Sequence, residues 1–151
     1  MDKDLLKQLR KLSQQYAYTS IQMHEAVARK AGFSGTDHKY LGFFLQKGAM
    51  TAGELSSLTG LTTGAVTGLI DRFEKKKLVK RQFAAADRRK VIIEPNTKNI
   101  MALLEPLYKE YRNKSGKLMA SFSVEELKTI EAYFVKAIEI MTETTDKLNN
   151  K

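Results

Sequence analysis

The spacing of apolar residues changes near the middle of this chain, and that change constrains the fold more than any other feature. From Thr51 to Lys77, apolar residues recur at steps of three and four, which predicts helix. Gly60 divides this stretch in two, because glycine readily adopts the left-handed conformation that ends a helix. After Leu78, apolar and polar residues alternate, as they do in a half-buried strand. The sequence therefore predicts two short helices followed directly by strands.

Capping residues mark where the two short helices begin. Thr51 precedes Glu54 by three residues, which is the pattern of a capping box. Thr62 or Thr63 caps the second helix, which we expect to run to about Lys77. Two helices joined by a tight turn that contains glycine form a helix-turn-helix.

Two short strands are predicted after the second helix. Residues 79–83 alternate, and residues 91–93 form a β-branched run. A turn over residues 84–89 joins them into a hairpin, and Pro95 ends the second strand. A hairpin directly after a helix-turn-helix is the wing of a winged helix.

Long helices flank this central region. Residues 4–30 form one amphipathic helix, and Thr36 or Asp37 caps the helix after it. A helix from Thr97 to about Met119 is expected to kink at Pro106, and Ser123 with Glu126 begins a last helix. The predicted fold is mainly α with a small β-hairpin wing. We expect an N-terminal dimerisation helix (residues 1–35), a winged helix-turn-helix domain (36–95) and C-terminal dimerisation helices (96–151).

Positive charge is concentrated in one segment. The chain of 151 residues has a formal net charge of +9, and residues 72–90 hold nine positive and two negative side chains, a net +7. A basic patch favours contact with nucleic acid or with an anionic membrane surface. Because the charge is clustered beside the predicted wing, we interpret it as a binding surface.

The second helix of the helix-turn-helix has one apolar face and one face of small residues. Val66, Leu69, Ile70 and Phe73 follow a helical stripe and are predicted to face the core. Glycine inside a helix costs roughly 1 kcal/mol against alanine. Two explanations stay open for the glycines on the other face: a close approach to the major groove, where hydroxyl and methyl groups can meet base edges, or tight packing against a neighbouring helix. The expected DNA-binding residues are Thr62, Thr63, Gly64, Ala65, Thr67, Gly68, Arg72, Lys75, Arg88, Arg89 and Lys90.

The predicted wing tip reads Asp87-Arg88-Arg89-Lys90. An arginine on a hairpin tip can enter the minor groove, where the potential is most negative. By itself the run is better explained as a solvated charged turn. Its position after a helix-turn-helix favours contact with DNA.

The stretch from Thr51 to Ile93 resembles the MarR (multiple antibiotic resistance regulator) family. The resemblance rests on Gly60-Leu61-Thr62-Thr63-Gly64-Ala65-Val66-Thr67, on Leu69-Ile70-Asp71-Arg72-Phe73-Glu74-Lys75 and on Ala86-Asp87-Arg88-Arg89-Lys90. It implies a homodimer held by the terminal helices, with the second helix in the major groove and the wing in the minor groove. It also implies that Asp87 braces the wing through an arginine, with Asp71 as part of that bracing, and that Arg88 or Arg89 inserts.

Members of this family often bind small aromatic or phenolic effectors between the dimerisation helices and the winged domain. Residues of suitable chemistry are Tyr16, Met23, Tyr40, Phe44, Tyr108 and Tyr111. Tyrosine and methionine at helical spacing are more often part of the core.

Other functions find little support in the residues. The chain has no cysteine and two histidines, His24 and His38, and it lacks a glycine-rich phosphate loop, so we expect no enzyme, metal site or cofactor. No apolar run reaches the roughly 20 residues that span a membrane, and the N-terminus lacks the apolar region of a signal peptide. We expect a cytoplasmic, sequence-specific transcriptional regulator, a repressor that binds a pseudo-palindromic operator in double-stranded DNA as a homodimer and is released by a small effector. The alternative is a winged-helix module for protein interaction without specific DNA binding.

Overall fold

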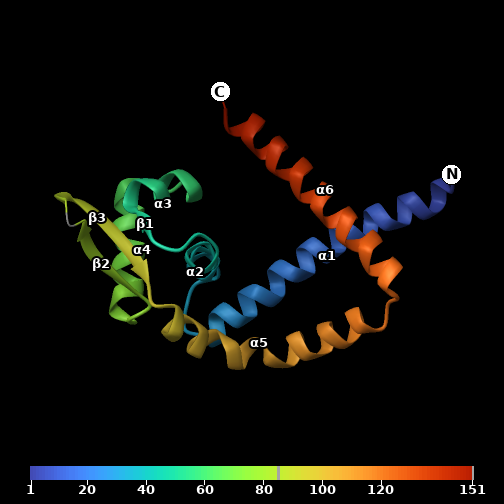
Figure 1. Cartoon of the computed structure of the whole chain (residues 1–151), viewed down its shortest axis with the longest axis horizontal. Coiled ribbons are helices and arrows are strands. Elements are labelled where there is room, and N and C mark those ends of the chain that lie inside the picture. Colours follow the sequence, from blue (N-terminus) through green and yellow to red (C-terminus); the bar gives the residue numbers. More distant parts are fainter. Residues whose placement is uncertain (85, 151) are drawn as a thin grey trace. The chain divides into compact units, whose positions relative to one another are not determined.

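The computed structural model describes residues 1–84 and 86–150, without the side chains of residues 84 and 87–89. The chain forms two compact units, residues 1–108 and 109–151. The first unit holds the helix-turn-helix, the hairpin and the helices packed on them (Figure 1).

Helix α1 (Lys3–Lys30) begins at Asp2, whose carboxylate accepts hydrogen bonds from the backbone N–H groups of Asp4 and Leu5. Helix α2 (Gly35–Lys47) is capped by Ser34, whose hydroxyl accepts from the backbone N–H of Asp37 at 3.2 Å. The predicted caps, Thr36 and Asp37, are therefore wrong. Asp37 lies inside the first turn, and its carboxylate binds a partner on another helix.

The helix-turn-helix is confirmed. Helix α3 (Ala52–Thr59) is capped by Thr51, and helix α4 (Thr63–Lys75) by Thr62. Gly60 ends α3 in the left-handed conformation with φ of 73°, as its position predicts. Helix α4 ends two residues earlier than expected, and Lys77 takes a positive φ of 59° in the turn into the first strand of the hairpin.

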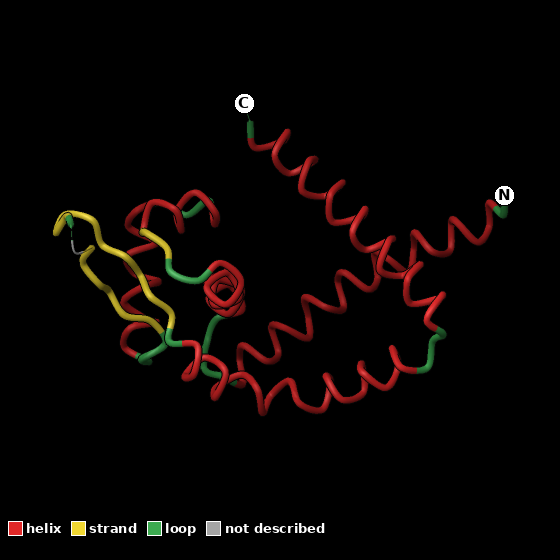
Figure 2. The backbone as a smooth tube through the Cα atoms, viewed as in Figure 1, coloured by secondary structure: helices red, strands yellow, loops and turns green. Residues whose placement is uncertain are grey.

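The wing strands β2 (Val79–Ala84) and β3 (Asp87–Pro95) pair antiparallel, and β1 (Met50–Thr51) adds a third strand in the order β1-β3-β2 (Figures 1 and 2). The hairpin is confirmed, with Pro95 as the last residue of β3. The sequence did not predict β1, because two residues are too few to show an alternating pattern. Its pairing of Met50 with Ile93 attaches the start of the helix-turn-helix to the wing.

One apolar core holds the first unit together. Phe73 of α4 lies at its centre, and its ring meets the edges of Phe33 and Phe44 at centroid distances of 5.9 and 6.4 Å. Fully buried side chains come from α2, α3, α4, β3 and the start of α5: Leu41, Phe44, Leu55, Val66, Leu69, Ile70, Phe73, Ile93 and Ile100. The core thus fixes α4 and the wing on a shared base.

Helix α5 (Thr97–Ala120) runs through Pro106 without ending, and helix α6 (Val124–Asn149) begins with the predicted capping box of Ser123 and Glu126. No residue of α6 is buried within the chain, although α6 has a stripe of apolar side chains. In the described part of the chain, no helix is both long and apolar enough to cross a membrane.

Candidate nucleic-acid interface

Helix α4 has the two faces that its sequence predicts. Val66, Leu69, Ile70 and Phe73 are buried. The opposite face of the first two turns carries only small side chains, and Thr63, Gly64, Ala65 and Thr67 are exposed. The surface of α4 is therefore low and open at its N-terminal end.

Packing within the chain does not require glycine at position 64. A Cβ atom built on Gly64 would meet no atom within 4 Å, and one on Gly68 would meet only the guanidinium of Arg72 at 3.4 Å. The described chain therefore gives no packing reason for Gly64.

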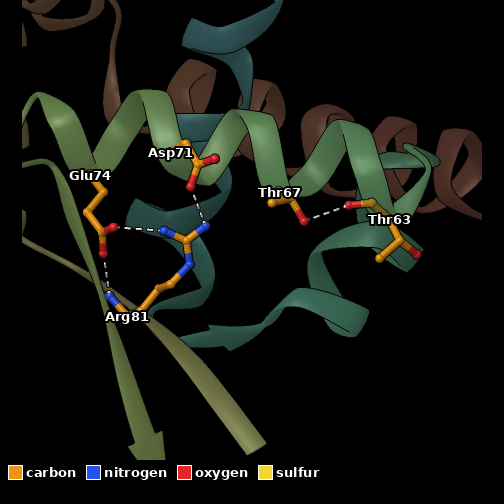
Figure 3. A network of polar contacts seen from close by, with 5 residues as sticks. All are labelled: Thr63, Thr67, Asp71, Glu74 and Arg81. Carbon is orange, nitrogen blue, oxygen red and sulfur yellow. Dashed lines mark hydrogen bonds and ion pairs between the residues drawn. The ribbon is translucent and has the colours of Figure 1, made fainter.

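Two hydroxyl groups on α4 have local partners. Thr62 caps the helix by accepting from the backbone N–H of Ala65 at 3.2 Å. The Thr67 hydroxyl donates to the carbonyl of Thr63 at 3.0 Å (Figure 3). Its hydrogen is then committed to the helix, and its lone pairs remain able to accept from an outside donor.

An ion pair joins α4 to α2. The Nε and Nη2 atoms of Arg72 donate to the two carboxylate oxygens of Asp37 at 2.7 and 3.0 Å. The hydrogen bonds that Arg72 donates to Asp37 raise the pKa of Arg72. This fork-to-fork geometry fixes the distance and the rotation between the two helices.

A second network joins α4 to the wing (Figure 3). Arg81 of β2 donates from Nη2 to Asp71 at 2.6 Å and from Nη1 to Glu74 at 2.7 Å. The backbone N–H of Arg81 also donates to Glu74, at 3.0 Å. Burial opposes the charge of Arg81, but hydrogen bonding to Asp71 and attraction to Glu74 outweigh it and raise the pKa. Arg81 thus holds the base of the wing against one face of α4.

Several cations of the basic segment are exposed around this network. Lys75 at the end of α4, Lys80 on β2 and Lys90 on β3 are exposed to solvent. Lys76 instead lies over the ring of Phe33, with Nζ 4.9 Å from the centroid. The predicted roles of Asp87, Arg88 and Arg89 concern side chains that lie outside the described part of the structure.

The six residues considered for an effector pocket have different surroundings. Tyr40 and Phe44 belong to the core, Tyr16 is exposed, and Tyr111 lies in the second unit. A cavity of about 580 Å³ between α1 and α2 is lined instead by Ile21, His24, Glu25, Thr36, His38, Lys39 and Gly42.

Tyr108 of α5 joins two residues that line this cavity. Its hydroxyl lies 2.6 Å from Nδ1 of His24 and 3.1 Å from Nε2 of His38. Burial, and then the nearness of His24, lower the pKa of His38. Burial also raises the pKa of Tyr108, so its phenol keeps its proton at neutral pH.

Sequence reasoning missed Arg81, Asp37 and the two histidines as parts of these networks. The sequence did carry a signal for Arg81. Together with Val79 and Phe83, it occupies every second position of the strand, so a charged side chain lies on the apolar face and needs a partner there. Asp37 was taken for a helix cap. Nothing local to His24 or Tyr108 reveals a contact between residues 84 positions apart.

A helix-turn-helix whose second helix is braced against a hairpin wing defines the winged helix-turn-helix proteins. Residues 31–90 match the MarR family. An HTH-type transcriptional regulator of Bacillus subtilis, YcgE, is 39% identical over 132 residues, which cover 85% of this chain and 83% of that protein. The chain belongs to the MarR family of transcriptional regulators.

Solved structures show the same fold. A MarR family protein from Bacillus stearothermophilus is 26% identical, with a TM-score of 0.71 over 94% of this chain and 99% of that one. A MepR variant from S. aureus, bound to an oligodeoxyribonucleotide, is 21% identical, with a TM-score of 0.58 over 88% of this chain and 97% of that one. The latter likeness concerns the fold alone.

Proposed function

We propose that the protein is a cytoplasmic repressor that binds a pseudo-palindromic operator as a homodimer and is released by a small aromatic or phenolic effector. The observation that carries the DNA-binding part is the low, open end of α4, held in place by Asp37 and Arg81 beside a basic wing. A structural relative has been seen with an oligodeoxyribonucleotide.

Helix α4 is the part proposed to enter the major groove. Thr63, Gly64, Ala65 and Thr67 would lie closest to the bases, because nothing larger projects from that face. Threonine hydroxyls can accept from base amino groups, and the Ala65 methyl can meet a thymine methyl. Thr62, Gly68, Arg72 and Lys75 complete the proposed contact surface of the helix.

The wing is the part proposed to reach the minor groove. Arg88 or Arg89 would insert there, and Lys90 would contact phosphate. Asp71 supports this proposal, because its carboxylate holds Arg81 at the base of the wing. Asp87 is proposed to assist in that bracing.

The proposed dimer forms through the terminal helices, residues 1–35 and 96–151. It would cover apolar surface that the single chain leaves exposed. Leu5, Leu9 and Leu12 of α1 and Phe134 and Ile138 of α6 are each about half exposed. A second copy of the chain is the proposed cover, since two-fold dimers are the commonest assembly and suit a palindromic operator.

Effector release is the third part of the proposed function. Tyr16, Met23, Tyr108 and Tyr111 remain candidates for an aromatic effector, and the cavity between α1 and α2 offers a space of suitable size. A set of phenolic acids added to a protein–DNA complex tests it. Persistence of the complex at millimolar concentration of every compound would contradict release by this class.

Selection from random double-stranded DNA tests operator binding. A homodimer should return two-fold symmetric sites with half-sites about one helical turn apart. Recovery of single, asymmetric half-sites would contradict the dimer. Failure to enrich any sequence would favour the alternative, a winged-helix module for protein interaction.

Substitutions on helix and wing should have different effects on the selected site. Thr67→Ala should change which site is preferred, by the ~1–3 kcal/mol typical of a base contact. Arg88→Ala should weaken binding to cognate and scrambled DNA alike, because minor-groove readout is degenerate. An unchanged ratio of cognate to scrambled affinity in Thr67→Ala would contradict the placement of α4. Wild-type affinity in both Arg88→Ala and Arg89→Ala would contradict the placement of the wing.

A further inference from the structure

Three helices of the first unit meet at a single phenol. Tyr108 of α5 is within hydrogen-bond distance of His24 on α1 and of His38 on α2. The two imidazole rings are stacked, with centroids 6.0 Å apart. These are the only two histidines of the chain. The cluster of His24, Tyr108 and His38 therefore contains every side chain that ordinarily changes charge between pH 5 and 8 in a chain without cysteine.

The hydrogen atoms in this cluster can be counted. A phenol donates one hydrogen bond and accepts others. With both imidazoles neutral, one ring donates N–H to the phenol oxygen and the other accepts the phenol hydrogen. One added proton on the donating ring changes neither bond, because the new hydrogen goes to its other nitrogen. A second proton makes both rings donors, and the phenol hydrogen then has no acceptor within the cluster.

Electrostatics oppose the second proton as well. Two imidazolium rings at this separation repel each other. Two residues of opposite charge, Glu25 of α1 and Lys39 of α2, line the same cavity as the histidines. On α5, Glu105 lies one turn before Tyr108 and is half-buried. The cluster therefore keeps both hydrogen bonds with no added proton or one, whereas a second proton removes the bond that the phenol donates and places two positive rings beside each other.

The cluster lies one residue from the contact that positions α4. His38 follows Asp37 in the first turn of α2, and Asp37 holds Arg72 of α4 through two hydrogen bonds. A movement of this turn away from Tyr108 would move the carboxylate that aligns α4. The path from His24 to α4 thus consists of side-chain contacts and one helical turn.

We propose that the cluster of His24, Tyr108 and His38 is a proton-sensitive latch that holds α4 in its DNA-binding position and opens when both histidines are protonated. The proposal rests on DNA binding by α4. His24 is exposed, so protons reach the cluster directly from solvent.

The expected direction follows from the state of His38. Its pKa is lowered in the closed cluster, so the open form binds the proton more tightly. Above about pH 6.5, the ordinary pKa of histidine, His38 contributes its full stability to the closed form. This contribution is lost as the pH falls through the lowered pKa of His38. Acid should therefore weaken DNA binding, although a gain of positive charge alone would strengthen it.

The test compares DNA affinity at pH 7.5 and pH 5.0, at one salt concentration, using the full chain and its selected operator. The wild type should bind at least about fivefold more weakly at pH 5.0, the low end of coupling between sites in proteins. His38→Gln keeps a hydrogen-bonding group beside Tyr108 but cannot take a proton, and it should lose this pH dependence. Tyr18→Phe removes an exposed phenol from α1, outside the cluster, and should behave as the wild type.

NMR of the imidazole protons gives a second readout, which does not need DNA. His38 should titrate below its ordinary range in the wild type, and it should return towards that range in Tyr108→Phe. Equal affinity at both pH values, or a wild-type pH response in His38→Gln, would overturn the latch and leave DNA binding intact. Absence of DNA binding at pH 7.5 would overturn the proposed function and the latch with it.

Discussion

Asp37 and Arg72 form an ion pair whose partners are buried to different extents. The side chain of Asp37 is 11% exposed and that of Arg72 is 56% exposed. Removing the arginine leaves a carboxylate buried without its partner, whereas removing the carboxylate leaves a guanidinium that water can solvate. The cost of an unpaired group depends on its burial.

Arg72→Met should therefore lower the free energy of unfolding more than Asp37→Asn does. We expect Arg72→Met to cost about 1–3 kcal/mol and Asp37→Asn to cost less, because solvent screens the exposed guanidinium of Arg72. Urea unfolding of both variants and of the double variant provides the measurement. Equal losses in the two single variants would show that the burial of Asp37 does not matter.

The same pair of variants separates two roles of Arg72. If Arg72 also contacts phosphate, Arg72→Met should reduce the slope of log affinity against log salt by about 1, whereas Asp37→Asn should leave that slope unchanged. If Arg72 acts only by aligning α4, both variants should weaken DNA binding at an unchanged slope. A salt titration of the two variants distinguishes these outcomes.

Gly64 offers a second prediction at the scale of a residue. Gly64→Ala should stabilise α4, by up to about 1 kcal/mol, because alanine has the higher helix propensity and the added methyl meets nothing within 4 Å. The same methyl should weaken DNA binding if the helix backbone approaches the groove closely. Stability and affinity should thus move in opposite directions.

Gly116 is a matched control for this substitution. It also lies within a helix, α5, and a Cβ there would also meet nothing within 4 Å. Gly116→Ala should raise the melting temperature without changing DNA affinity. If Gly64→Ala raised the melting temperature and bound the operator as tightly as wild type, close approach at position 64 would be excluded.

At the scale of elements, one arginine braces the wing against α4. Arg81 joins β2 to Asp71 and Glu74, which lie three residues apart and so project from the same side of α4. The rest of the hairpin is held by its own ladder and by the pairing of β3 with β1. The Arg81 network therefore adds a polar brace between wing and helix to the apolar packing of Val79 and Ile93 in the core.

Arg81→Met should weaken DNA binding severalfold while preserving the ratio of cognate to scrambled affinity, because the groove-facing residues of α4 are untouched. The free energy of unfolding should fall by about 1–2 kcal/mol, since Asp71 and Glu74 are partly solvated. Lys80→Met, one residue earlier, removes a cation from a looser pair with Glu94 at 3.7 Å and serves as the control. A larger loss of affinity in Lys80→Met than in Arg81→Met would show that charge, not bracing, dominates at this strand.

Elements and contacts differ in how far the sequence predicts them. Gly60, Thr51 and the stripe from Val66 to Phe73 specify α3 and α4, because caps and periodicity are local properties. Strand β1 was missed, since it exists only through pairing with β3. Asp37 was misread as a cap because its partner is 35 residues away, and a local pattern holds no information about such a contact.

In the whole molecule, one apolar face of α1 contributes to the core at one end and is proposed to form part of the dimer interface at the other. The stripe of α1 that contains Leu5, Leu9 and Leu12 continues to Val27, which is buried in the core. Along its first half the same stripe is exposed, each leucine by about half. A single chain thus buries only the end of a continuous apolar face, and a second copy is the proposed cover of the remainder.

Leu9→Glu combined with Leu12→Glu should convert the proposed dimer to a monomer that is still folded, because both positions are exposed in the single chain and a carboxylate there stays solvated. Tyr18→Glu is the control, since Tyr18 is 69% exposed on the opposite side of α1. Light scattering gives the mass, and circular dichroism shows that helix content is kept. The monomer should bind the full operator no more tightly than one half-site, because only a two-fold dimer engages two successive major grooves. If the doubly substituted chain were a well-behaved dimer, α1 would not be part of the interface. If it were a monomer with full affinity for the symmetric site, operator recognition would not require dimerisation.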